Sequence, residues 1–378
     1  MNFNTDIKHK RRMKYSLIIP VYNRPDEVDE LLQSLTMQTC KDMEVVVVED
    51  GSDIPCEAVV QKYAKLLDLK YFRKPNSGPG QTRNYGAERS QGEYLIVLDS
   101  DCVLPPGYLA AVDRELSANP CAAFGGPDRA HESFSPVQKA INYSMTSFFT
   151  TGGIRGGKKK MDKFYPRSFN MGIQASLYRQ LGGFSEMRFG EDIDFSIRIF
   201  KSGAQCRLFP EAWVWHKRRT DFRKFFRQVH NSGIARINLW KRHPESLKLV
   251  HLLPAVFTVG VVLLLLLLTT SLIFMGLGIF AAYGASGAGV HCISGPVFVL
   301  TLGGFMAMMS LAPLLLFALL IFADSWWKNR SAKVAWLSIK ASFIQLIGYG
   351  SGFIRAWWAR CVMGRNEELQ AFKKTFYK

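Results

Sequence analysis

Apolar residues follow two different patterns along the 378-residue chain. Up to about residue 248 they form short runs, such as 15–22 and 44–48, separated by segments in which they recur at helical spacing. Strands and helices that alternate in this way are typical of a parallel sheet with right-handed crossovers. From Leu249 onward the apolar runs are much longer. The pattern predicts an α/β domain with a Rossmann-like, mostly parallel sheet, followed by transmembrane or interfacial helices.

Polar residues stand where the predicted strands end. Asn23 and Arg24 follow the first strand, Asp50 ends the second, and Asp99 and Asp101 follow the strand at 94–98. Ligands of open α/β sheets bind at the carboxyl ends of the strands. If the strand continues through them, Asp99 and Asp101 project from the same side, and a divalent cation would relieve their repulsion. The alternative for each of these turns, taken alone, is ordinary turn chemistry.

The glycine patterns of common nucleotide sites are missing. No G-x-G-x-x-G follows the first strand, and the chain contains no G-x-x-x-x-G-K-[ST], which disfavours a dinucleotide dehydrogenase or a P-loop enzyme. A different glycine loop at 76–84 precedes a predicted helix and contains Arg83. Its glycines let backbone amides approach an anion, and Arg83 is suited to pair with phosphate.

The formal net charge of +17 requires an anionic partner. Nucleic acid and the anionic cytoplasmic face of a membrane are both candidates, and the long apolar runs favour anionic membrane lipids over nucleic acid. The seven cysteines form no C-x-x-C pair, so we predict neither a disulfide framework nor a zinc site.

Two uncharged apolar segments, 250–283 and 296–323, exceed the roughly 20 residues that span a bilayer. The connection at 284–295 contains no Lys or Arg, whereas 209–248 and 324–333 are rich in both. By the positive-inside rule, we expect the α/β domain to lie in the cytoplasm, as part of a multi-pass inner-membrane protein.

A third apolar segment, 334–358, has basic flanks on both sides. If this segment crosses the membrane, the basic residues after it lie outside the cytoplasm, against that rule. A helix that lies in the membrane interface, anchored by Trp357 and Trp358, fits nearly as well as a span. The sequence does not decide whether the chain crosses the membrane two or three times. The predicted domains are an α/β domain at 14–245, a membrane region at 249–358 and a basic tail at 359–378.

The order of the motifs, more than any one of them, indicates a family. Four motifs surround Asn23, Asp50, Arg83 and the Asp99-Ser100-Asp101 turn, and a later one is Gly190-Glu191-Asp192-Ile193-Asp194. Over roughly residues 14 to 240 the set resembles the inverting family 2 glycosyltransferases of the membrane-anchored bacterial type, which have the GT-A fold.

The resemblance implies a role for each matching residue. Asp50 would recognise the nucleotide base, Asp99 would lie near the ribose, and Asn23, Arg24 and Arg83 would help bind the donor. Asp101 and His216 would hold Mg²⁺ or Mn²⁺. Asp192, with Glu191 beside it, would be the catalytic base that inversion requires. The alternative for His216 is an ordinary histidine in a basic loop. The alternative for Asp192 and Glu191 is that their carboxylates only stabilise a helix N-terminus.

The resemblance therefore predicts a metal-dependent, hexosyltransferase-type enzyme of cell-envelope polysaccharide biosynthesis. It would move a sugar from a nucleotide-sugar donor to a lipid-linked or surface-glycan acceptor at the cytoplasmic membrane face. A processive polysaccharide synthase is an alternative, disfavoured because no Q-x-x-R-W follows the Glu191-Asp192 motif. An inactive nucleotide-sugar-binding scaffold is a second alternative, disfavoured because all the acidic motif positions are present.

Overall fold

The structure, a computed structural model, describes residues 14–152, 165–287 and 294–369, which form two compact units. The first unit contains the described residues up to 134 and from 165 to 218, and the second contains 135–152, 219–287 and 294–369. The predicted domain ranges 14–245, 249–358 and 359–378 stay predictions. The compact units divide the chain elsewhere because 135–152 pack with the C-terminal helices. The last nine residues of the predicted tail lie outside the described residues.

The first unit is built on a seven-stranded sheet. In spatial order its strands are β3 (Leu69–Lys74), β2 (Met43–Asp50), β1 (Tyr15–Val21), β4 (Tyr94–Leu98), β8 (Asn170–Gln174), β6 (Ala123–Gly125) and β9 (Cys206–Leu208). The first four strands are parallel, β8 runs antiparallel to both of its neighbours, and β6 pairs in parallel with β9. The prediction of a mostly parallel α/β sheet is confirmed.

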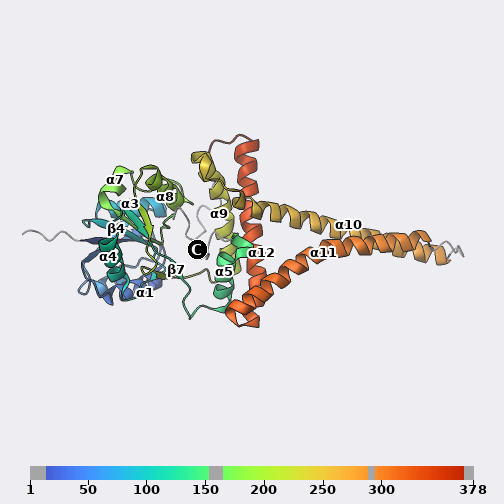
Figure 1. Cartoon of the computed structure of the whole chain (residues 1–378), viewed down its shortest axis with the longest axis horizontal. Coiled ribbons are helices and arrows are strands. Elements are labelled where there is room, and N and C mark those ends of the chain that lie inside the picture. Colours follow the sequence, from blue (N-terminus) through green and yellow to red (C-terminus); the bar gives the residue numbers. More distant parts are fainter. Residues whose placement is uncertain (1–13, 153–164, 288–293, 370–378) are drawn as a thin grey trace, which may run out of the picture. The chain divides into compact units, whose positions relative to one another are not determined.

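Helices cover both faces of this sheet (Figure 1). One face carries α1 (Pro25–Thr36), α2 (Glu57–Tyr63) and α4 (Tyr108–Ala118), and the other carries α3 (Pro79–Glu88), α7 (Ala175–Gln180) and α8 (Glu191–Lys201). Successive strand residues point to opposite faces, so Leu17 and Ile19 join the first layer while Ile18 joins the second. Burial on both faces explains why these strands are almost wholly apolar.

A second, three-stranded sheet lies beside the end of β4. It contains β5 (Cys102–Val103), β10 (Val214–His216) and β7 (Asp128–Arg129), with β10 in the middle. The antiparallel pairing of β10 with β5 sets His216 opposite Cys102, and its parallel pairing with β7 sets Val214 opposite Asp128. This sheet joins three segments that are far apart in the sequence.

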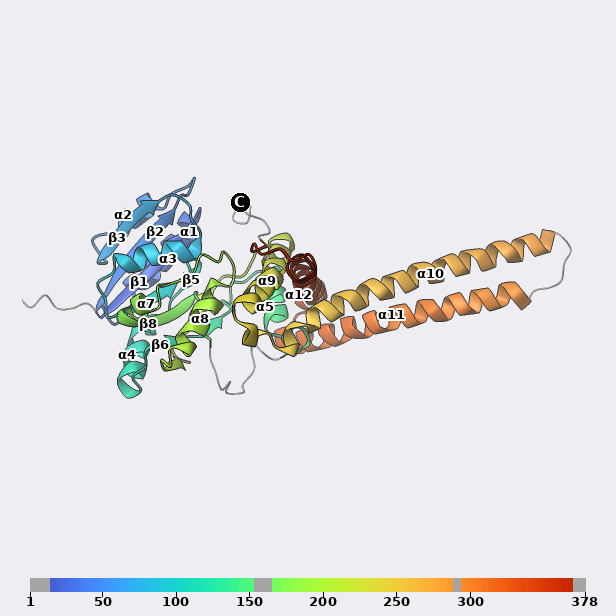
Figure 2. The same cartoon turned by 90° about the horizontal axis from the view of Figure 1, so that it is seen from above.

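The second unit is helical. Its helices are α5 (Pro136–Thr146), α6 (Phe148–Thr151), α9 (Phe222–Arg242), α10 (Leu253–Gly287), α11 (Ser294–Asn329) and α12 (Ala332–Trp357), with short 3₁₀ helices at Pro244–Ser246 and Leu249–His251 and a π turn at Trp358–Val362. Figure 2 shows α10 and α11 side by side as a long hairpin. The helices α5 and α9 both pack against α12, with Ala140, Phe225 and Ala341 in their common core.

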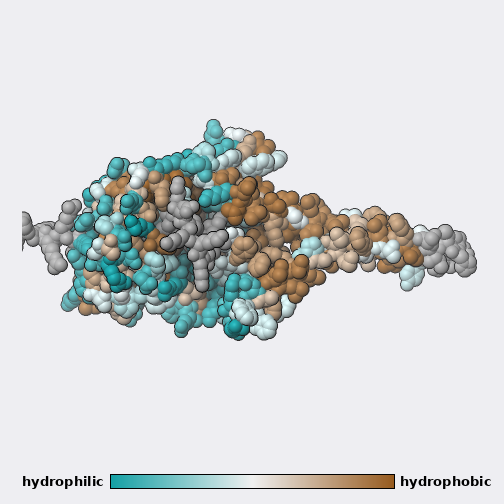
Figure 3. Space-filling model, in the orientation of Figure 1, coloured by the Kyte–Doolittle hydropathy of each residue, from teal (hydrophilic) through white to brown (hydrophobic). Residues whose placement is uncertain are grey.

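Two helices are long and apolar enough to cross a membrane, over Leu249–Tyr283 and Gly295–Asn329. Only 17% and 11% of their most apolar windows are buried inside the structure, so neither resembles the core helix of a soluble protein. Figure 3 shows the apolar surface that they present. Among the described residues α12 does not meet the same criterion. It buries one stripe, against α9, α5 and α10, and exposes Trp336 and Trp357 on other sides.

Candidate active site

The turn after β4 separates the two carboxylates of the Asp99-Ser100-Asp101 motif. The strand ends at Leu98 and a turn follows, so the condition under which both carboxylates would project from one side, a strand that continues through them, is not met. The side chain of Asp99 is 29% exposed, whereas that of Asp101 is 11% exposed. The backbone N–H of Cys102 donates to the carbonyl of Asp99 (3.1 Å), which closes the turn. The two carboxylates therefore have different partners.

Asp101 lies between a cation and an imidazole. Its Oδ2 pairs with Nη1 of Arg24 at 2.5 Å, and its Oδ1 lies 3.2 Å from Nε2 of His216. The backbone N–H of Lys217 donates to the Asp101 carbonyl (3.1 Å), which fixes β10 against the turn. The ligand atoms of Asp101, Cys102 and His216 all lie within 4.8 Å of one another. The structure thus brings together Arg24, Asp101 and His216 from three distant segments.

This donor set fits a hard divalent cation. A carboxylate oxygen and an imidazole nitrogen suit Mg²⁺ or Mn²⁺, with substrate oxygens and water completing the shell. The thiol of Cys102 is a soft ligand, so it would be a poor partner for either ion. It is fully buried and contacts the carbonyl of Phe169 at 3.5 Å.

A further carboxylate, Asp128, lies on the other side of His216. Its Oδ2 is 3.9 Å from Nδ1 of His216 and 2.5 Å from Nη2 of Arg218. No sequence pattern indicates Asp128, because it begins the two-residue strand β7 and belongs to no repeated pattern. Only the pairing of β7 with β10 places it beside the histidine. Sequence reasoning missed this residue.

Arg83 joins the two acidic motifs. Its Nη2 pairs with Oδ1 of Asp99 at 2.8 Å, and its Nη1 pairs with Oε1 of Glu191 at 2.9 Å. The guanidinium is 4% exposed and lies over the ring of Phe184, 5.2 Å from its centroid. The two carboxylates raise the pKa of Arg83 further above its usual value, against the opposing effect of burial. A permanently charged group thus ties the end of β4 to the start of α8.

The start of α8 carries Glu191 and Asp192. Gly190 precedes the helix with φ of +86°, a left-handed conformation that glycine adopts without strain. Burial raises the pKa of Glu191 to about 7, although Arg83 favours its charged form. Oδ2 of Asp192 pairs with Nε of Arg167 at 2.8 Å. Arg167 is a second residue that sequence reasoning missed.

Asn23 and Asp50 shape loops at the same end of the sheet. Oδ1 of Asn23 accepts hydrogen bonds from the backbone of Asp53 (2.8 Å) and Ile54 (3.0 Å). The carboxylate of Asp50 accepts from the backbone N–H groups of Ser77 and Gly78, both at 2.9 Å, and from the ammonium group of Lys74. A carboxylate has about four acceptor positions, so Asp50 retains room for one further donor.

Comparison with known proteins gives a consistent result. Residues 16–182 match the family model described as "Glycosyl transferase family 2". An "Uncharacterized glycosyltransferase" of Haemophilus influenzae is 29% identical over 194 residues, which are 49% of this chain and 62% of that protein. A GalNAc(5)-diNAcBac-PP-undecaprenol beta-1,3-glucosyltransferase of Campylobacter jejuni is 32% identical over 115 residues, 30% of this chain and 37% of that protein. Each similarity spans less than two thirds of the curated relative.

A solved structure extends the likeness to most of the chain. The mannosyltransferase PcManGT from Pyrobaculum calidifontis, solved in complex with GDP-Man and Mn2+, has a TM-score of 0.51 and is 14% identical. The match covers 93% of this chain and 89% of that one. At this identity the likeness concerns the fold, and it agrees with the predicted GT-A-like domain followed by C-terminal helices.

Proposed function

We propose that this chain, which belongs to glycosyl transferase family 2 through residues 16–182, transfers one sugar from a nucleotide-sugar donor with inversion. The acceptor is a lipid-linked or surface glycan at the cytoplasmic face of the cell membrane. The observation that carries the proposal is the convergence of the two acidic motifs, since Arg83 bridges Asp99 to Glu191 while Asp101 contacts His216.

Asp101 and His216 would hold the Mg²⁺ or Mn²⁺ ion, which supplies positive charge to the developing diphosphate leaving group. In the structure Arg24 neutralises Asp101. With donor bound, Arg24 would exchange this carboxylate for a diphosphate oxygen, a ligand that guanidinium groups bind well. Asp128 lies 3.9 Å from Nδ1 of His216, beyond hydrogen-bond distance, and would orient the imidazole when metal binding brings the two groups together.

The nucleoside part of the donor would lie at the ends of β1, β2 and β4. Asp50 would recognise the base through its remaining acceptor position, while Asn23 and Asp50 hold the loops at 52–54 and 75–78. Asp99 would accept from the ribose. Arg83, held between Asp99 and Glu191, would fix the distance between donor and acceptor groups.

Asp192 would act as the base. In-line attack by the acceptor hydroxyl requires a group that removes its proton, and a positioned carboxylate contributes typically 10²- to 10⁴-fold to such a step. Asp192 is the more suitable of the two neighbours, because its partner Arg167 is 35% exposed, whereas Glu191 is held by Arg83, which is only 4% exposed. Arg167 would orient the Asp192 carboxylate through their ion pair.

The membrane placement is supported by the two exposed apolar helices α10 and α11. The Campylobacter relative, whose name includes an undecaprenol-linked acceptor, supports the proposal of a lipid-linked acceptor. The basic residues around the two candidate spans support contact with anionic lipids on the side where the catalytic domain lies.

The proposal is tested by a donor screen on the purified full chain in vesicles, with lipid-linked acceptors present and nucleoside diphosphate release as the readout. We expect one nucleotide sugar to be turned over, with activity lost on chelation and restored by Mn²⁺ or Mg²⁺. Activity that persists in excess chelator would refute the metal role of Asp101 and His216. Binding of nucleotide without turnover of any donor would favour the inactive scaffold.

A further inference from the structure

The segment that contains α5 and α6 belongs to the helical unit, although in sequence it lies between β7 and β8 of the sheet unit. Ala140 and Ile141 of α5 are fully buried in a core that also contains Phe225 of α9 and Val334 of α12. The chain therefore leaves the sheet unit, contributes two helices to the unit that holds α10 and α11, and returns. The family motifs do not explain why this segment packs with the helical unit.

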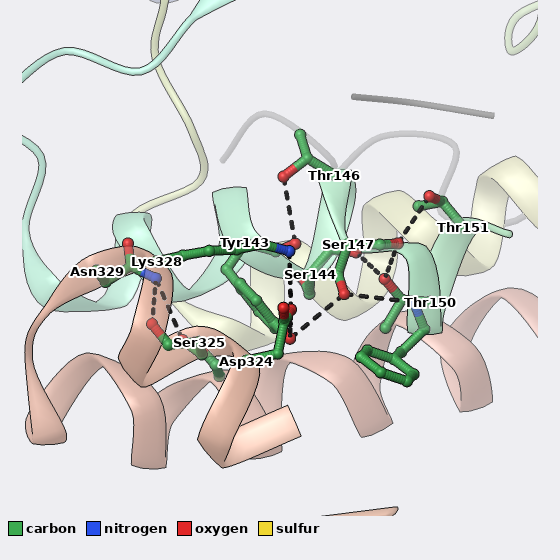
Figure 4. A network of polar contacts seen from close by, with 12 residues as sticks. Tyr143, Ser144, Thr146, Ser147, Thr150, Thr151, Asp324, Ser325, Lys328 and Asn329 are labelled. Atoms are coloured by element: carbon green, nitrogen blue, oxygen red, sulfur yellow. Dashed lines mark hydrogen bonds and ion pairs between the residues drawn. The ribbon is translucent and has the colours of Figure 1, made fainter. Parts of the chain in front are cut away.

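A polar network fastens α5 to the end of α11 (Figure 4). The hydroxyl of Tyr143 donates to Oδ2 of Asp324 at 2.6 Å, and Nζ of Lys328 pairs with the same oxygen at 2.8 Å. The Lys328 ammonium also lies over the Tyr143 ring, 5.5 Å from its centroid. The hydroxyl of Ser147 donates to that of Tyr143 at 3.3 Å. This network fixes the depth of α5 relative to the second candidate span.

The hydroxyl groups near α6 are satisfied within the segment itself. Ser144, Thr146 and Thr151 donate to the backbone carbonyls of Ile141, Asn142 and Ser147 at 2.8–2.9 Å. Thr150 donates to the carbonyls of Ser144 and Ser147. Polar groups that enter lipid must find partners inside the protein, because the hydrocarbon offers none. This hydroxyl-rich turn already meets that condition without water.

Two aromatic side chains are exposed on this same turn. Phe148 is 69% exposed and Phe149 is 39% exposed, and their rings lie 6.2 Å apart. Trp326 and Trp327, next to Asp324 on α11, are also exposed, at 55% and 72%. Trp and Tyr gather at the boundary between the bilayer and water, and interfacial helices carry Trp, Phe or Leu on the face that enters the bilayer. The exposed pair thus lies on an element tied to the end of a span where tryptophans are also exposed.

We propose that α6 inserts Phe148 and Phe149 into the interfacial layer of the bilayer, so that the excursion between β7 and β8 is a third membrane contact beside α10 and α11. The inference rests on the membrane placement in the proposed function. The partner of the exposed phenylalanine pair is lipid, because the satisfied hydroxyls, the exposed phenylalanines and the attachment to α11 all suit an apolar boundary. A second protein docked on the pair is the competing occupant.

Photocrosslinking of the full chain in phosphatidylethanolamine–phosphatidylglycerol vesicles tests this inference. p-Benzoylphenylalanine replaces Phe148 in one variant, a change that conserves an aromatic ring. The matched variants carry it at Leu266, which is exposed on α10, and at Ile54, which is exposed in the sheet unit. Irradiation is followed by mass spectrometry of the labelled peptides.

We expect phospholipid adducts at position 148 in a yield within about threefold of that at Leu266, and none at Ile54. Adducts at Leu266 without any at 148, or a protein adduct at 148, would overturn the inference and leave the spans intact. A lack of lipid adducts at both 148 and 266 would overturn the membrane placement, and with it this inference.

Discussion

At the scale of single residues, the candidate site depends on ion pairs between distant segments. Asp101 and Arg24 are 77 residues apart in the sequence, and Arg83 and Glu191 are 108 apart. The resemblance to a family identified all four positions, but the pairing itself needed the structure. The spacing of Asp99 and Asp101 suggested one shared side, and the turn at the end of β4 gives each carboxylate its own partner instead.

Asp128 provides a prediction at this scale. Loss of a group that orients a metal-ligating histidine typically costs 10- to 100-fold in metal affinity. Asp128→Asn should therefore raise the Mn²⁺ concentration for half-maximal activity by about tenfold, with a smaller effect on the rate at saturating metal. Metal titration of donor turnover measures this. Asp26→Asn, an exposed carboxylate in the first turn of α1, is the matched control. An unchanged metal titration curve would remove Asp128 from the proposed site.

Asp128 and Arg167 also show why the sequence could not supply the whole site. Asp128 begins the two-residue strand β7 and Arg167 lies in the segment before β8. Neither belongs to a periodic pattern, so nothing local indicates that they face His216 and Asp192. By contrast Asp50, Asp99 and Asp101 follow long apolar strands whose carboxyl ends predict a ligand edge. The site residues at the ends of long strands were predictable, whereas their partners from a short strand and from an irregular segment were not.

At the scale of elements, the long apolar strands and helices followed the sequence pattern closely, because burial on both faces of a sheet requires continuous apolar runs. The role of α12 was less predictable. Its glycines permit backbone contact with α9: a Cβ on Gly352 would lie 2.0 Å from the carbonyl oxygen of His230. That contact holds α12 against the helical unit, a packing that hydrophobicity alone does not indicate.

Gly352→Ala tests this contact. The added methyl group forces the two backbones apart, and overpacking of this kind costs about 1–3 kcal/mol of stability. We expect a clear fall in the unfolding temperature in detergent, measured by circular dichroism. Gly304→Ala on α11, where a Cβ would meet nothing within 4 Å, should leave the unfolding temperature nearly unchanged. Equal effects of both substitutions would show that α9 and α12 do not pack closely.

His230 gives the same helix pair a pH dependence. Burial, with the positive charge of Arg355, lowers the pKa of His230 below 6.5, although a hydrogen bond at Gly348 acts in the other direction. As the pH falls through about 6.5, the imidazole gains a proton in the unfolded chain but not in the folded chain. The free energy of unfolding is therefore retained above that pH and falls below it. His230→Gln should reduce the loss of unfolding temperature between pH 7.5 and 5.5. An unaltered loss would contradict this account.

At the scale of the whole molecule, the chain combines a GT-A-like sheet unit with a helical unit that carries two exposed apolar helices. Two segments of the sequence, 135–152 and the described residues of 219–369, contribute to the helical unit, so the chain passes between the units more than once. The sequence pattern indicated the long helices directly. It could not indicate that α5 belongs with them, because α5 has the composition of an ordinary amphipathic helix.

The most direct test of the central claim is sugar transfer in sealed membrane vesicles that contain the full chain. Radiolabelled nucleotide sugars are added outside inverted vesicles, whose cytoplasmic face is exposed, and label is counted in the solvent-extracted lipid. With the correct donor we predict label in lipid from inverted but not right-side-out vesicles, and a fall of at least 100-fold for Asp192→Asn, as expected on loss of a catalytic base. Equal labelling by wild type and Asp192→Asn, or by both vesicle orientations, would contradict the account.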